Sequence, residues 1–175
     1  MIDIVTADPG RVDELSAFFD RNDPGCFCMW PRCPPMRFEP ADPANREAMR
    51  QLVASGGRPG LLALRDGRTV GWCAVAPQSE YPQYADPEPG RWGIACVLVD
   101  PSVRGEGVAR ALVEAAVVYA AEHGAETIDG PPPWWRPREE RQAAALVRVL
   151  VECGFEKVGE GARMPVLRKE VALAR

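Results

Sequence analysis

The sequence has no run approaching the roughly 18 uncharged apolar residues that a membrane-spanning helix requires. Its first residues include Asp3, Asp8, Asp13 and Glu14, so they do not form the apolar core of a signal peptide. It also lacks a basic excess, since 25 acidic residues outnumber 21 basic ones and the net charge is −4. Nucleic-acid binding draws on clustered Lys and Arg. We therefore expect a cytoplasmic protein with no membrane and no nucleic-acid partner.

Histidine is represented only by His123, and this scarcity limits what the six cysteines can do. In a cytosolic chain the cysteines are expected to be reduced thiols. Cys26, Cys28 and Cys33 cluster, but their C-x-C-x4-C spacing lacks the C-x2-C knuckle typical of zinc sites, and His123 lies far along the chain. We expect small apolar side chains packed beneath a loop, and no metal. A thiol-based metal or redox protein built on these three cysteines is the alternative.

The residues that are present fit one ordinary globular domain over 1–175. Hydrophobic residues make up 46% of the chain and charged residues 26%, which is enough to bury a full core. Apolar periodicity and turn residues predict the element order βααβββαβαββ. The fold class is therefore α/β, with a central mixed, twisted sheet and helices on both faces. The expected strands are 2–5, 61–64, 69–76, 92–99, 126–129, 155–158 and 164–171, and the expected helices are 11–19, 44–54, 105–123 and 138–153.

A glycine-rich turn between residues 104 and 109 carries the functional argument. It follows a buried strand and a proline-started loop, and a long helix follows it. The first turn of any helix has amide N–H groups without helical partners, and the helix dipole adds partial positive charge. Gly105 and Gly107 let the backbone approach an anion and adopt positive φ. The pattern predicts a phosphate cradle, to which Arg104 and Arg110 add charge-assisted contacts.

Two common nucleotide-binding turns do not fit this stretch. A P-loop needs Gly-Lys-Ser/Thr, and the sequence lacks that tripeptide. A dinucleotide-binding turn needs G-x-G-x-x-G directly after its strand. Here Pro101 to Arg104 intervene, and Arg110 stands at the third glycine position.

The hexapeptide Arg104-Gly105-Glu106-Gly107-Val108-Ala109 instead resembles the signature Arg/Gln-x-x-Gly-x-Gly/Ala of the GNAT acetyltransferase superfamily. The preceding Val99-Asp100-Pro101, the pair Gly154-Phe155 after the last helix and the element order are also typical of it. The segment Cys-Phe-Cys-Met-Trp and the strand 71–75 look like a little-characterised bacterial branch of the superfamily.

This resemblance implies acetyl-CoA as cosubstrate. Pantetheine is expected as a pseudo-strand beside 96–99, where that strand splays away from 126–129, with the backbone N–H of Val97 facing the developing oxyanion. Pro131 to Pro133 suit such a splay because proline cannot donate to a ladder. The implied cofactor-binding residues are Val97, Leu98, Val99, Arg104, Gly105, Glu106, Gly107, Val108, Ala109 and Arg110.

Two departures from the superfamily leave the acid and the base open. Leu150 stands where many relatives place a general-acid Tyr, and Ile94 and Cys96 stand where many carry a Glu. Water can then relay the proton, or other residues can take the place of the missing acid and base. Our catalytic candidates are Glu80, Tyr81, Tyr84 and Asp129, although the first three also fit a solvated loop and Asp129 also fits a turn. His123 fits a partner of a helix dipole better than a base.

The residues that bind the acceptor substrate are predicted from irregular segments rich in aromatic side chains. Residues 23–43 are dense in Pro, Cys and aromatics, which prevents long regular structure and requires cover from the core or from a ligand. The substrate-binding candidates are Cys28, Trp30, Trp134 and Trp135. The function implied is acetyl transfer, by direct attack, to a primary amine of a small molecule or an amino terminus. A catalytically reduced CoA-binding regulatory module is the alternative. Many relatives are dimers, so a homodimer is one of the oligomeric states that the sequence leaves open.

Overall fold

The computed structural model describes residues 1–34, 38–39, 41–84, 86–132, 140–161 and 164–171. Seven strands form one sheet in the order β1-β2-β3-β4-β5-β7-β6. The β4–β5 pair is parallel and the other five pairs are antiparallel, so the sheet is mixed as predicted. The strands are β1 (Asp3–Thr6), β2 (Gly60–Arg65), β3 (Arg68–Pro77), β4 (Arg91–Val99), β5 (Thr127–Gly130), β6 (Glu156–Glu160) and β7 (Pro165–Glu170).

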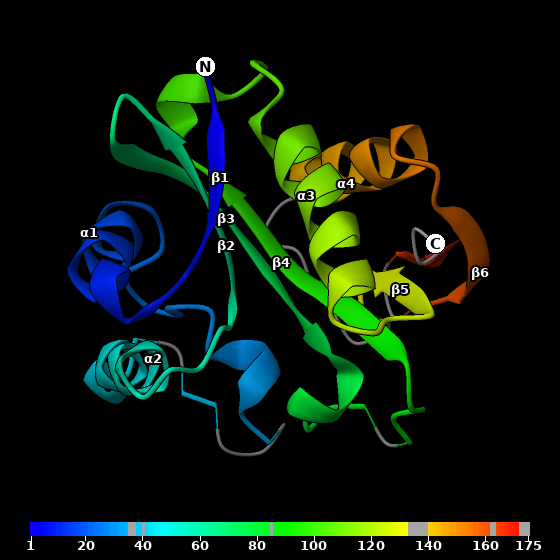
Figure 1. Ribbon diagram of the computed structural model, residues 1–175, viewed down its shortest axis with the longest axis horizontal. Helices are drawn as coiled ribbons and strands as arrows, with labels where there is room; N and C mark the ends of the chain where they lie inside the picture. Colours follow the sequence, from blue (N-terminus) through cyan, green and yellow to red (C-terminus); the bar gives the residue numbers. More distant parts are fainter. Residues whose placement is uncertain (35–37, 40, 85, 133–139, 162–163, 172–175) are drawn as a thin grey trace.

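Helices cover both faces of this sheet, as the sequence predicted. Figure 1 shows α1 (Val12–Asn22) and α2 (Pro43–Ala54) on one side, and α3 (Val108–Glu122) and α4 (Glu140–Glu152) on the other. Each face has its own core: Phe18, Phe19 and Trp72 are fully buried beneath α1 and α2, whereas Leu112 and Leu150 are fully buried beneath α3 and α4. No helix of the described residues is long and apolar enough to cross a membrane.

The start of α3 differs from its predicted position. The expected helix began at Gly105, but the observed helix begins at Val108. Gly105 and Gly107 both have φ near +83°, a left-handed conformation that interrupts a right-handed helix and that glycine adopts at little cost. The two glycines therefore form a separate turn ahead of the helix.

The parallel pairing of β4 and β5 is short. It runs from Arg91 opposite Thr127 to Gly93 opposite Asp129, and no later pair is formed in the part of the chain that the structure describes. On its other side β4 stays paired with β3 as far as Val99, apart from a register shift that leaves Ala95 as an extra residue. A bulge of this kind bends a strand. The outer half of β4 thus separates from β5 just after Gly93, and this is the predicted splay.

Candidate active site

The glycine turn presents backbone amides to solvent at the start of α3. Ahead of it, the Asp100 carboxylate accepts hydrogen bonds from the Ser102 backbone N–H at 3.0 Å and from its hydroxyl at 2.7 Å. These bonds lower the pKa of Asp100. Val103 and Val108 anchor the turn in the core, while residues 104–107 are exposed. Among the described residues, no atom lies within 4 Å of a Cβ built on Gly107. The open space fits a phosphate group at a helix N-terminus.

The charges around this turn differ from those expected. Arg110, predicted to face the phosphates, pairs along α3 with Glu114 at 2.8 Å (Nε to Oε1). Arg65, at the end of β2, approaches Glu106 at 2.6 Å (Nη2 to Oε2). The positive charge of Arg65 offsets the negative charge of Glu106, which is the one acidic side chain of the turn. The sequence did not indicate Arg65, because the packing of α3 against β2 and β3 is what brings the end of the hairpin beside the turn.

The splayed edge of β4 leads from this turn towards the centre of the sheet. Val97, Leu98 and Val99 are half-buried, whereas Trp92 to Ala95 before them are buried. The change in burial follows from the loss of β5 as a neighbour. Backbone groups of this edge are available to hydrogen-bond an extended ligand, as strand addition requires.

Three of the four catalytic candidates converge on Gly93, where β4 and β5 separate. A Cβ built on Gly93 meets the Tyr84 hydroxyl at 3.2 Å and the Tyr81 ring at 3.6 Å, and Asp129 is the strand partner of Gly93. The two tyrosine rings lie 6.4 Å apart. A side chain larger than glycine at this position would press on the Tyr84 hydroxyl. The fold therefore gathers Tyr81, Tyr84 and Asp129 at the point where the sheet opens.

Asp129 is almost fully buried and held by three hydrogen bonds. The Arg168 guanidinium donates to its two oxygens, from Nε at 2.6 Å and from Nη2 at 2.8 Å, and the Gln78 side chain donates at 3.1 Å. The bidentate pair raises the pKa of Arg168 and fixes the Asp129 carboxylate in place. Arg168 stands directly opposite Asp129 on β7. Neither Gln78 nor Arg168 was among the predicted site residues, because the register of β5 and β7 brings Arg168 to Asp129 and the short 3-10 helix after β3 brings Gln78 there.

The two tyrosines differ in their surroundings. Burial raises the pKa of Tyr81 well above its usual value of 10.0, and the Tyr81 hydroxyl has no hydrogen-bond partner among the described residues. Burial and then the Asp129 carboxylate raise the pKa of Tyr84. Both phenols are therefore protonated near neutral pH. A buried hydroxyl without a partner is costly, which makes the Tyr81 hydroxyl the candidate donor of this cluster.

Glu80 lies apart from this cluster. Its side chain is half-exposed and accepts a hydrogen bond from Arg32 at 3.0 Å. Arg32 also donates to the Pro59 carbonyl at 3.1 Å and lies 5.0 Å from the centre of the Tyr81 ring. The contacts of Glu80 fit a role in holding Arg32 over Tyr81 rather than proton transfer at the splay.

Leu150 and His123 behave as the sequence analysis described. Leu150, where relatives carry a tyrosine, is fully buried, and its Cδ1 lies 3.6 Å from a Cβ built on Gly130. An apolar side chain thus faces the end of β5. His123 follows α3, and its Nδ1 lies 2.7 Å from the Tyr119 carbonyl, a contact that suits the negative end of a helix dipole.

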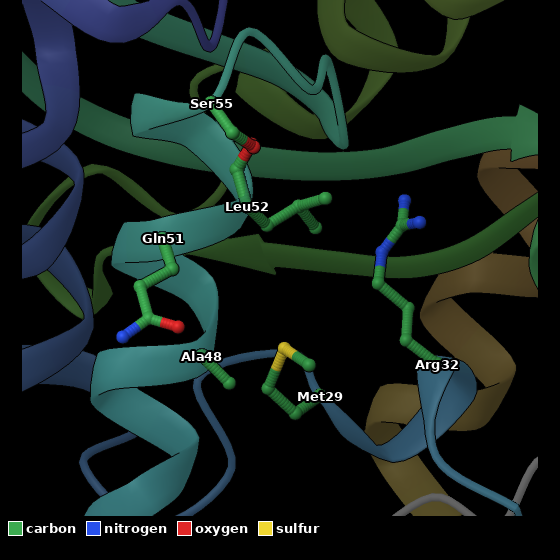
Figure 2. A pocket seen from close by; sticks show the side chains of 6 residues that line it. All are labelled: Met29, Arg32, Ala48, Gln51, Leu52 and Ser55. Atoms are coloured by element: carbon green, nitrogen blue, oxygen red, sulfur yellow. The ribbon is translucent and has the colours of Figure 1, made fainter.

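The loop after α1 forms one wall of a pocket of about 570 Å³ on the α1/α2 side of the sheet (Figure 2). Cys28, a predicted substrate residue, is buried in the core below it, while Trp30 is half-buried and packs edge-on against Phe38. Trp134 and Trp135 lie outside the described residues. Six residues line the pocket: Met29, Arg32, Ala48, Gln51, Leu52 and Ser55.

The three clustered cysteines differ in burial. Cys28 is buried and packs in the core beneath α1 and α2, whereas Cys26 and Cys33 are half-buried, and all three are free thiols. Among the described residues, no three His, Cys, Asp or Glu side chains are grouped so that they could hold a metal ion.

Comparison with known proteins shows which family the chain resembles. Residues 14–130 match the model of the acetyltransferase (GNAT) family. Solved structures that resemble the chain include yncA of Salmonella typhimurium with its cofactor acetyl-CoA (TM-score 0.63, 16% identity, 98% of this chain and 95% of that one). Others are the aminoglycoside N-acetyltransferase AAC(6')-Iy with CoA (0.63, 16%, 91% of each) and the ribosomal-protein-alanine N-acetyltransferase of Brucella melitensis (0.59, 20%, 96% and 99%). No curated protein sequence matches the chain.

Proposed function

Because the chain belongs to the acetyltransferase (GNAT) family, in which acetyl-CoA is the acyl donor, we propose that it acetylates a primary amine of a small molecule or an amino terminus. The observation that carries the proposal is the convergence of Tyr81, Tyr84 and Asp129 on Gly93. This point lies at one end of the splayed edge of β4, and the glycine turn lies at the other. An extended cosubstrate bound along that edge spans both.

The cosubstrate supplies an acyl group activated as a thioester. The amides of residues 105–109 bind its pyrophosphate, and the backbone of Val97 and Val99 orients its arm. The Val97 N–H, close to the bulge at Ala95, donates to the carbonyl oxygen as negative charge develops there.

Tyr81 is the proton donor for the leaving sulfur. Its hydroxyl is protonated, buried and in need of an acceptor. The Asp129 side chain already accepts hydrogen bonds from Arg168 and Gln78, so both of its oxygens are engaged and it orients the incoming amine rather than removing its proton. Water beside Tyr84 carries the amine proton away.

The pocket beside α2 accommodates the non-reacting part of the acceptor. Its volume is in the range of small-ligand sites. Met29, Ala48 and Leu52 supply apolar surface, and Gln51 and Ser55 supply polar atoms (Figure 2). Arg32 lines this pocket, and its guanidinium also lies 5.0 Å from the centre of the Tyr81 ring. A small amphipathic amine fits these surroundings.

Two measurements test the proposal. Calorimetry with acetyl-CoA, using NAD and ATP as controls, is expected to give micromolar binding to acetyl-CoA alone. Mass spectrometry then follows acetylation in a panel of small amines and peptides with free amino termini. Ala48→Trp is expected to raise the KM of the acceptor without changing the Kd of acetyl-CoA. Failure to bind acetyl-CoA contradicts the central claim.

Leu150 favours a second candidate, a regulatory module that binds CoA with reduced catalysis. The position that supplies a general acid in many relatives is here fully buried and apolar. Such a module binds acetyl-CoA as tightly as an enzyme but releases no CoA beyond the rate in buffer, whichever amine is offered. The acetylation screen separates the two functions.

A further inference from the structure

Arg32 is a buried cation that lines the acceptor pocket and also contacts the Tyr81 ring (Figure 2). It ends the single-turn 3-10 helix η2 (Trp30–Arg32), and its side chain is only 8% exposed. Its Cζ atom lies over the Tyr81 ring, 5.0 Å from the ring centre. A cation within about 6 Å of the centre of an aromatic ring is attracted by the electrons of the ring face. Arg32 therefore has a direct electrostatic contact with the side chain that we propose as the proton donor.

Contacts from two other segments hold the guanidinium in this position. Nη1 donates to the Glu80 carboxylate at 3.0 Å, and Nη2 donates to the Pro59 carbonyl at 3.1 Å. The Gln83 side chain donates to the first carbonyl of η2 at 2.6 Å, which holds the loop a second time. Glu80 and Gln83 stand on either side of Tyr81 in the chain. The segment that carries the ring thus also binds the loop that carries Arg32.

Stability alone does not account for an arginine at this place. The Arg32 Nε is buried and has no hydrogen-bond partner among the described residues. Burying a charged group whose donors are not all bonded costs free energy. The ion pair with Glu80 offsets little of this cost, because the Glu80 carboxylate is half-exposed. Side chains that break the rules of packing in this way are typical of functional sites.

The position of Arg32 favours the ionised form of Tyr81. Burial raises the pKa of Tyr81, and the charge of Arg32 opposes that rise. Other ionisable groups near Tyr81 raise its pKa when they are charged: Cys28, Cys73 and Tyr84. The nearby carboxylates of Glu80 and Asp129 are each paired with an arginine. Because a phenolate ring is richer in electrons than a phenol ring, its attraction to the guanidinium is stronger after the proton has left than before.

We propose that Arg32 is a positioning residue for acetyl transfer, which fixes the Tyr81 ring and stabilises the negative charge left on Tyr81 when its proton moves to the departing sulfur. The inference rests on the proposed function, in which Tyr81 is the proton donor. In that step the thioester C–S bond breaks, its electron pair goes to the sulfur, and the sulfur takes the Tyr81 proton. The proton that water carries from the amine then restores the phenol.

Fluorine NMR of the free protein tests this contact without an acceptor. The chain has three tyrosines, and a difluorinated tyrosine incorporated at all three ionises at lower pH than tyrosine does. Tyr81→Phe assigns the Tyr81 signal, and circular dichroism at each pH establishes that the protein is folded. The Tyr81 signal is expected to titrate about one pH unit higher in Arg32→Met than in the wild type. Arg32→Lys, which keeps a cation, is expected to titrate between the two.

Arg46→Met is the matched control for the loss of an arginine. Arg46 on α2 pairs with Asp20 on α1 at 3.2 Å, and the pair is partly exposed. This variant is expected to leave the titration of Tyr81 as it is in the wild type. A Tyr81 signal that titrates at the same pH or lower in folded Arg32→Met overturns the proposal.

Acetyl transfer to the panel of small amines and peptides tests the consequence for the rate. At saturating acetyl-CoA and amine, Arg32→Met is expected to lower kcat about fivefold to thirtyfold, and Arg32→Lys to lower it less. Saturation is needed because Arg32 also lines the acceptor pocket, so its replacement changes KM as well.

The double variant distinguishes this inference from the proposed function. In a Tyr81→Phe background, Arg32→Met is expected to cause no further loss of kcat, because Arg32 acts through the Tyr81 hydroxyl. A further loss overturns the proposal. A shifted titration with an unchanged kcat in Arg32→Met contradicts instead the donor role of Tyr81 in the proposed function.

Discussion

Arg65 at the end of β2 reaches across to Glu106 in the glycine turn, with 2.6 Å between Nη2 and Oε2. Glu106 is the one acidic side chain in a turn expected to bind a pyrophosphate, and its charge opposes such a ligand. Arg65 offsets that charge, and the carboxylate in turn raises the pKa of the guanidinium. The pair is partly exposed, so its influence falls on binding at low salt more than on folding.

Replacing Arg65 therefore tests the electrostatics of the turn. Arg65→Met is expected to raise the Kd of acetyl-CoA roughly threefold to tenfold at low salt, because Glu106 is left uncompensated beside the phosphates. Adding Glu106→Gln to the variant restores most of the affinity. Titration calorimetry at two salt concentrations measures both effects. Arg110→Met is the control, since Arg110 pairs with Glu114, and a loss as large as that of Arg65→Met contradicts the assignment.

Gly107 is the position where the backbone of the turn is most sensitive. Gly107→Val forces a β-branched residue to φ near +83° and places methyl groups in the open space above the turn. We expect acetyl-CoA binding to weaken by about 2 kcal/mol, roughly thirtyfold. Gly124→Val is the control, because Gly124 has a similar φ and similar open space at the far end of α3. Calorimetry of the two variants separates backbone strain from loss of the phosphate site, and equal affinities remove the turn from the site.

Tyr81 allows stability and catalysis to be separated. Tyr81→Phe removes a buried hydroxyl that has no partner among the described residues, so the free energy of unfolding is expected to stay the same or rise. The rate of acetyl transfer is expected to fall about tenfold to a hundredfold, because a proton donor is lost. Urea unfolding and initial rates measure the two quantities. A variant with unchanged kcat shows that Tyr81 is not the donor.

The same tyrosine predicts a dependence of stability on pH. Burial raises the folded-state pKa of Tyr81 above its ordinary value of 10.0. A group whose pKa is raised by folding stabilises the fold fully below its unfolded pKa, and the stabilisation is lost as pH rises through the folded value. The wild type should therefore lose stability above pH 10 more steeply than Tyr81→Phe. Urea midpoints for both proteins between about pH 8 and 11 measure the difference, and parallel curves contradict it.

The bidentate pair of Arg168 and Asp129 makes removal of one partner costly. Arg168→Met leaves the Asp129 carboxylate buried with only Gln78 as a side-chain donor among the described residues. We expect a loss of about 3 kcal/mol in the free energy of unfolding. Asp129→Asn in the same chain should recover part of it, because the uncompensated charge is removed. Denaturant unfolding of the single and double variants measures these changes in free energy. If the losses of the two single variants simply add in the double variant, the two residues do not depend on each other.

Local sequence signals set the positions of most elements. The Asp66-Gly67 turn, where both residues have positive φ, places the hairpin of β2 and β3 as predicted. Proline and Asp42 begin α2, and glycines follow α3 and α4 where the pattern expected helix ends. The predicted start of α3 was three residues early because Gly105 and Gly107 form a turn of their own ahead of the helix.

The cluster of side chains around Gly93 was visible only in part from the sequence. Tyr81, Tyr84 and Asp129 were identifiable as residue types near the splay, and the structure brings them together around Gly93. Glu80, two residues after Gln78 in the same segment, lies elsewhere. The direction of a side chain in a short irregular segment depends on backbone dihedrals, which sequence periodicity does not report.

What the sequence determined by itself is the family, the glycine turn and the alternation of strands and helices, because each is written in residues close together along the chain. Only the tertiary structure decided that Arg168 holds Asp129, that Arg65 neutralises Glu106 and that Tyr81 and Tyr84 lie against Gly93. Each of these contacts joins residues on different elements. Their meeting depends on strand register, where a shift of one residue turns a side chain to the opposite face of the sheet.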